Sequence, residues 1–229
     1  KDIETGLPSK NQVLIPAFCD LSKKIGRERI VWRYDPIFIN DTYTVEYHKK
    51  YFKTLASKLG KYTEKCTVSF LDLYRNTERN IRPLGIRVPT EDEQMEIMKS
   101  FVETAQEYGF YIDTCAEEVD LSELGITHAR CIDQERIERI GKIHLDVKKD
   151  SNQRDVCGCV ASIDIGTYNT CKNGCAYCYA NYSKVTVENQ TQNHDPSSPL
   201  LFGRVGSDDV IKERKMKSLI QNQMSLFDF

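Results

Sequence analysis

The chain has 229 residues, 40% of them hydrophobic, and its 32 basic and 34 acidic side chains give a formal net charge of -2. This length and apolar content suit one substantial core, and the balanced charge excludes a global attraction to nucleic acid. No apolar run approaches the roughly 18 residues that cross a bilayer, and the first four residues lack the pattern of a signal peptide. We therefore expect a cytoplasmic protein without membrane contact.

Runs rich in β-branched and aromatic residues alternate with helical stretches in the first half of the chain. Strands are expected at residues 29–35, 65–71 and 110–114, and helices at 44–59 and 90–108. Thr90 and Glu93 form a capping box at the start of the second helix. The alternation predicts parallel strands, and three strands are too few to close a barrel. The fold class is therefore α/β, as part of a TIM-like (βα) barrel or as an open parallel sheet.

Polar side chains lie near the carboxyl ends of these strands, where parallel sheets bind ligands. The candidate catalytic residues are Arg33, Asp35, Asp72 and Glu117. A plainer interpretation stays open, because Asp35 precedes a proline as turn residues do, and Arg33 with Asp35 suits a surface ion pair. His48 stands among aromatic residues of a predicted helix, so we expect it to be packed.

Three cysteines form the pattern C-x3-C-x2-C, namely Cys171, Cys175 and Cys178. This is the spacing by which radical S-adenosylmethionine enzymes hold a 4Fe-4S cluster. Three ligands leave one iron open to the amino and carboxylate groups of S-adenosylmethionine, whose reductive cleavage needs an external reductant such as a flavodoxin or ferredoxin. Gly174 would allow a sharp turn near the cluster and Tyr177 would shield it, so both are candidate cofactor-binding residues.

Other metal sites also fit the cysteine pattern. A structural zinc is the alternative for the C-x3-C-x2-C run, although zinc cysteines usually come as two C-x2-4-C pairs. Four further cysteines are enough for a second cluster or a zinc ion: Cys115, Cys131, Cys157 and Cys159. For the first two, a role as ordinary thiols stays open. Cys19 and Cys66 lie in apolar runs and are expected in the core.

The composition becomes polar after about residue 183, which predicts a linker to residue 199 and then a charged helix at 208–221. We accordingly divide the chain into a barrel-like domain (1–150), an iron-sulfur segment (151–182) and a linker, basic helix and tail (183–229).

Blocks spread along most of the chain carry a family resemblance: residues 31–36, 69–72, 114–117, 131–133 and 157–181. In these blocks the chain resembles a bacterial family of uncharacterised proteins, domain of unknown function 1848. The resemblance implies a C-terminal cysteine cluster similar to the radical S-adenosylmethionine motif, and a segment that precedes residue 1. Two departures from ordinary radical enzymes stand out: the motif follows the strands, and no Gly-Gly-Glu segment is found.

The tail separately resembles the pentapeptide that binds the bacterial sliding clamp, with Gln223, Leu226 and Phe227 as its anchors. The sequence thus predicts an iron-sulfur enzyme of the radical S-adenosylmethionine type that acts on DNA, in repair. The alternatives are a metal-stabilised nucleic-acid-binding module and an electron carrier without radical catalysis.

Overall fold

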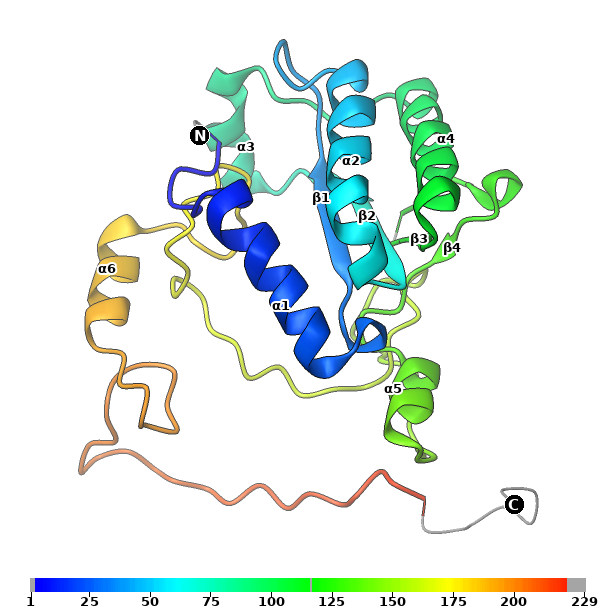
Figure 1. Ribbon diagram of the computed structural model, residues 1–229. Helices are drawn as coiled ribbons and strands as arrows, with labels where there is room; N and C mark the ends of the chain where they lie inside the picture. The colour runs from blue at the N-terminus through cyan, green and yellow to red at the C-terminus, as the bar shows by residue number, and fades with distance from the viewer. Residues whose placement is uncertain (1–2, 116, 222–229) are drawn as a thin grey trace.

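A four-stranded parallel sheet forms the centre of the molecule (Figure 1). The computed structural model describes residues 3–115 and 117–221. In them the strands lie side by side in chain order: β1 (Trp32–Ile37), β2 (Lys65–Phe70), β3 (Tyr111–Thr114) and β4 (Thr127–His128). The three predicted strands are confirmed to within a few residues, whereas β4 was not predicted. Among the described residues β1 and β4 are free edges, so the expected α/β class is confirmed as an open parallel sheet.

Two long helices cover one face of this sheet, α2 (Val45–Leu59) and α4 (Glu91–Tyr108). Both were predicted, and α4 is capped as expected. Thr44 accepts a hydrogen bond from the backbone of α2, and Thr90 and Glu93 cap α4 reciprocally. Phe52 and Phe101 stack between the two helices with ring centroids 3.7 Å apart, over the apolar side of β2 that carries Cys66. This layer is the core of the domain.

The remaining helices surround that core. They are α1 (Ile15–Ile25), α3 (Arg75–Ile81), α5 (Gln134–Gly141) and α6 (Lys184–Gln192), with short helical turns at Lys10–Leu14, Arg27–Arg29, Gly60–Tyr62, Arg82–Leu84 and Ser122–Leu124. None of these helices is long and apolar enough to cross a bilayer, nor is any other helix in the described part of the chain.

Two predictions for the C-terminal part are wrong. The expected linker contains α6, which Ser183 caps and which buries Val187. The expected helix at 208–221 is instead an irregular, exposed segment that passes below the rest of the molecule in Figure 1 and pairs at its end with residues 144–146. Its apolar side chains find no core to cover, since Val210 and Ile211 are about four-fifths exposed, and a helix this short is marginal without packing.

The other face of the sheet is polar. Because side chains alternate along a strand, Lys65 and Thr67 point away from the core layer that Cys66 joins. Lys65 Nζ lies 2.5 Å from Asp113 Oδ2, and Thr67 Oγ1 donates to Asp113 Oδ1 over 2.6 Å. Lys65 and Asp113 are 3% and 4% exposed, so this buried pair is satisfied within the sheet.

Candidate functional site

The loop with Cys171, Cys175 and Cys178 lies against the N-terminal segment. Residue 4 forms an antiparallel bridge with Cys175, and the Ala176 amide donates to the Ile3 carbonyl over 2.8 Å. Ala176 and Tyr177 then pack on a second apolar cluster, whose buried members are Ile3, Phe38, Leu71, Ile81 and Ile86. Two of these directly follow β1 and β2. The loop therefore sits at the carboxyl end of the sheet.

Gly174 and Tyr177 fix how closely the two segments approach. Gly174 has a φ of +61°, and a Cβ at this position would lie 2.6 Å from Thr5 Oγ1, so both its backbone conformation and its surroundings require glycine. The Tyr177 hydroxyl donates to Glu4 Oε1 over 2.5 Å. Burial raises the pKa of Tyr177, and its hydrogen bond to the Glu4 carboxylate adds to this rise. Both residues hold the loop on the N-terminal segment.

The three loop thiols are free and reach the surface. Cys171 is exposed and the other two are half-buried. Among the described residues, no set of three or more His, Cys, Asp and Glu side chains is placed to hold a single metal ion. One tetrahedral ion needs sulfur atoms about 3.8 Å apart, whereas a cubane binds each thiolate at a different iron and needs them wider. Three thiolates at this spacing are a donor set that suits a cluster or a zinc ion.

Asp72 and Glu117 lie at the same edge of the sheet. The Asp72 carboxylate pairs with Arg154 over 2.6 Å, and Glu117 Oε1 accepts from the Phe70 amide over 3.0 Å. Burial, with a smaller contribution from the charge of Asp72, raises the pKa of Glu117 to about 7, although the hydrogen bond from the Phe70 amide lowers it. A carboxyl group with this pKa can donate or accept a proton near neutral pH.

Tyrosine rings connect these acids to the cysteine loop. Tyr74 follows Asp72 by two residues, and its ring centroid lies 5.2 Å from that of Tyr179, next to Cys178. The acid pair and the loop thus belong to one continuous edge of the molecule.

Arg33 and Asp35 form the ion pair that the sequence suggested. Arg33 donates to Asp35 Oδ2 from Nε over 2.9 Å and from Nη2 over 2.6 Å. A third contact was not predicted: Arg33 Nη1 donates to the sulfur of Cys131 over 3.2 Å. The four candidate catalytic residues therefore stand as two pairs, one beside the cysteine loop and one beside a further thiol.

That thiol belongs to a second group of cysteines. The sulfur atoms of Cys115 and Cys131 are 3.6 Å apart. Cys157 and Cys159 are 7% exposed each and pack together as a small buried cluster. The two pairs meet where the sulfur of Cys159 accepts hydrogen bonds from the amides of Cys131 and Ile132, over 3.1 and 3.4 Å. Three separate segments of the chain thus contribute to one group of four thiols.

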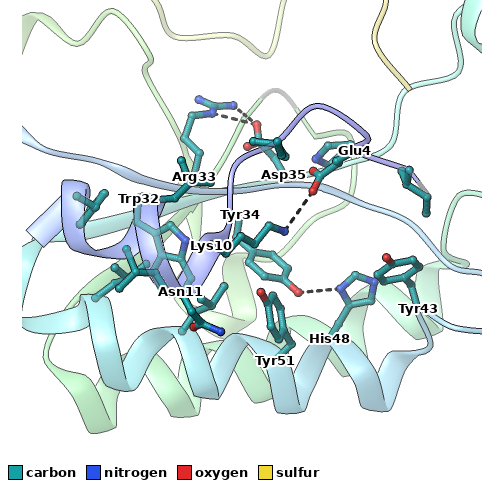
Figure 2. Close-up of a pocket in the computed structure, with 18 of the residues that line it drawn as sticks. Glu4, Lys10, Asn11, Trp32, Arg33, Tyr34, Asp35, Tyr43, His48 and Tyr51 are labelled. Atoms are coloured by element: carbon teal, nitrogen blue, oxygen red, sulfur yellow. Dashed lines mark hydrogen bonds and ion pairs between the residues drawn. The ribbon is translucent and has the colours of Figure 1, made fainter. Parts of the chain in front are cut away.

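A cavity of about 1050 Å³ opens between the N-terminal segment, β1 and α2 (Figure 2). His48 lies in its wall, where Nε2 donates to the Phe38 carbonyl over 2.8 Å and Nδ1 accepts from the Tyr34 hydroxyl over 2.9 Å. Burial lowers the pKa of His48, so it is a neutral, packed histidine as predicted. Sequence analysis missed the cavity, although tyrosines spaced by four residues, Tyr43, Tyr47 and Tyr51, are its signal.

The fold and these residues define an α/β protein with an open parallel sheet and two groups of cysteines at the carboxyl edge. A family model described as a domain of unknown function (DUF1848) matches residues 1–180. The chain therefore belongs to this family, and the match includes all nine cysteines. No curated protein and no solved structure matches the chain.

Proposed function

We propose that the chain is an iron-sulfur enzyme of the radical S-adenosylmethionine type, with Cys171, Cys175 and Cys178 as ligands of a 4Fe-4S cluster. The observation that carries the proposal is the C-x3-C-x2-C loop at the carboxyl end of a parallel sheet, the edge at which such sheets bind ligands. A cluster held by three thiolates supplies an open iron for S-adenosylmethionine and, when reduced, the electron that cleaves it.

The protein's own contribution is to hold the loop and to supply polar groups beside it. The bridge to residue 4 and the Tyr177–Glu4 hydrogen bond restrict the loop, so the thiols are positioned before any group binds. Glu117 supports an acid or base role on the substrate side, because its pKa of about 7 allows both protonation states. Arg154 pairs with the neighbouring Asp72 and holds its carboxylate in place.

Anaerobic expression of the full chain, followed by iron, sulfide and zinc counts, tests the ligand assignment. Cys175→Ala should remove about four irons and four sulfides per chain and abolish formation of 5'-deoxyadenosine from S-adenosylmethionine and dithionite. Cys19→Ala, a half-buried free thiol on α1, is the matched control and should change neither. Stoichiometric zinc without sulfide would instead identify a metal-stabilised binding module. An iron-sulfur protein that leaves S-adenosylmethionine intact would be an electron carrier.

We further propose DNA as the substrate class, with the sliding clamp as a partner. Support comes from the tail peptide with Gln223, Leu226 and Phe227, which lies outside the described residues, and from the exposed basic side chains at 212–217. A peptide of residues 218–229 should bind purified clamp in the micromolar range, on the order of 8 kcal/mol.

The clamp experiment has a matched pair of variants. Leu226→Ala with Phe227→Ala should abolish binding, because these side chains would fill the apolar pocket, whereas Gln221→Ala should leave it unchanged. Equal binding by all three peptides, or by none, would contradict the partner and remove DNA as the substrate class.

A further inference from the structure

The second group of cysteines is arranged as two pairs rather than as a ring of four. Cys115 and Cys131 form one pair, with sulfur atoms 3.6 Å apart. Two thiolates on one tetrahedral metal with bonds of about 2.3 Å lie about 3.8 Å apart, so this pair already has the separation that one metal requires. Both thiols are free, and Cys131 is exposed at the rim of the sheet.

Cys157 and Cys159 form the other pair. They are adjacent in the buried cluster, and the intervening Gly158 lets their loop approach the preceding segment, because a Cβ there would lie 2.9 Å from Arg130 Cγ. The loop is then held by the Val160 amide, which donates to the Ile132 carbonyl over 3.1 Å. These contacts bring the second pair next to the first.

Several donors already point at sulfur. The amides of Cys131 and Ile132 donate to Cys159, and Arg33 Nη1 donates to Cys131 over 3.2 Å. Hydrogen bonds from amides and cations to cysteine sulfur are typical of iron-sulfur sites, where they offset the negative charge of four thiolates and the sulfides. An ordinary buried thiol has no need of two backbone donors.

The paired arrangement favours two metal ions over one. A zinc site with four cysteine ligands needs all four sulfur atoms around one centre, and no set of three or more metal-ligating side chains is so placed in residues 3–115 and 117–221. A 4Fe-4S cluster binds each of its four thiolates at a different iron, so it does not match thiols that lie in pairs. A [2Fe-2S] cluster needs two thiolates on each of two irons, which sulfide ions bridge.

We infer that Cys115, Cys131, Cys157 and Cys159 bind a [2Fe-2S] cluster, with the first two on one iron and the last two on the other. The cluster exchanges single electrons with a small reductant or a redox protein at the exposed Cys131 side. Arg33 is a positioning residue of this site, because its guanidinium is fixed by Asp35 and donates to a ligand sulfur. This inference is independent of the radical chemistry proposed for the loop.

The test uses the full chain with Cys171, Cys175 and Cys178 changed to serine, which removes the loop site. After anaerobic reconstitution, this variant should hold about two irons and about two sulfides. Dithionite should add one electron and produce a paramagnetic signal that persists at temperatures where reduced 4Fe-4S clusters are no longer visible. Adding Cys157→Ser and Cys159→Ser should abolish both results, and adding Cys19→Ser should not.

Two further measurements guard against variants that do not fold. The Mössbauer spectrum of the unaltered chain with both sites loaded should assign about one third of its iron to a two-iron cluster. Arg33→Gln should lower the reduction potential of that cluster at an unchanged iron count, since it removes a donor to sulfur, and Arg33→Lys should lower it less.

Three results would overturn the inference. They are stoichiometric zinc without sulfide in the loop-serine variant, about four irons per chain in that variant, and a metal-free protein in which Cys115 and Cys131 are joined as a disulfide.

Discussion

The two cysteine groups differ in how the chain builds them. The loop thiols are close in sequence and belong to one loop, which the N-terminal segment holds in place. The four-cysteine group comes from three segments, and parallel strand pairing creates it: Thr114 pairs with His128, so Cys115 and Cys131 leave the ends of β3 and β4 at the same edge. The first group depends on a local turn, and the second depends on the sheet.

The largest expected effect is a loss of stability caused by a substitution in the sheet, on which the four-cysteine group depends. Asp113→Asn leaves the ammonium of Lys65 buried without its counter-charge, so the free energy of unfolding of the metal-free protein should fall by about 3–5 kcal/mol. Urea denaturation measures it. Replacing both partners, Lys65→Met with Asp113→Leu, should cost much less because no charge remains buried.

The same variant sharpens the comparison between the sites. Asp113 lies on β3, two residues before Cys115, which follows the strand. Asp113→Asn should therefore reduce iron at the four-cysteine group more than at the loop. An equal loss at both sites would show that the loop also depends on the sheet.

A smaller effect is expected in the loop. Gly174→Ala forces a left-handed backbone onto alanine and a clash with Thr5, so it should cost about 1–2 kcal/mol and release the loop from the N-terminal segment. Gly125→Ala is the matched control, because its φ is +71° but open space surrounds it. Loop iron should fall only in Gly174→Ala, as counted after reconstitution. A fall in both would mean that strain anywhere in the domain disturbs the loop.

The smallest effect is expected at a helix cap, as a reference that belongs to neither group. The hydrogen bond with Arg87, helped by the Thr90 amide, lowers the pKa of Glu93 from 4.5 to about 2. A lowered carboxyl pKa stabilises the fold above pH 4.5, and this stabilisation is lost as the pH falls through about 2. Glu93→Gln should therefore cost about 1 kcal/mol at pH 7 and nothing well below pH 2.

Thermal unfolding of the metal-free protein across this pH range measures the Glu93 effect, and at neutral pH the iron content of Glu93→Gln should equal that of the unaltered chain. A difference between the two proteins that is independent of pH would show that the cap acts through packing rather than through charge.

Local signals explain which elements were predictable. The helices α2 and α4 carry threonine caps, and β1 to β3 are rich in β-branched and aromatic residues, so sequence alone located them. The two-residue β4 has no pattern of its own and exists because β3 pairs with it. Polar composition concealed α6, whose stability comes from its Ser183 cap and from burial of Val187.

The candidate site shows the same limit. Spacing singled out the loop thiols as candidate ligands, and the carboxyl ends of the strands predicted that Asp72 and Glu117 lie near one edge, as they do. No spacing could show that Arg33 donates to Cys131, because the two residues are 98 positions apart and meet only through the sheet.

The contact between the N-terminal segment and the cysteine loop also has a consequence for the polymer. The hydrogen bond from Tyr177 to Glu4 joins residues 173 positions apart, so it closes almost the whole family-matched region into one ring. The entropy lost in closing a ring grows only slowly with its length. The chain must nevertheless lose this entropy before the contact can stabilise the fold. The ring should therefore close late in folding and open early in unfolding. A group bound by the loop thiols would stabilise the closed ring and would therefore delay the release of both of its ends.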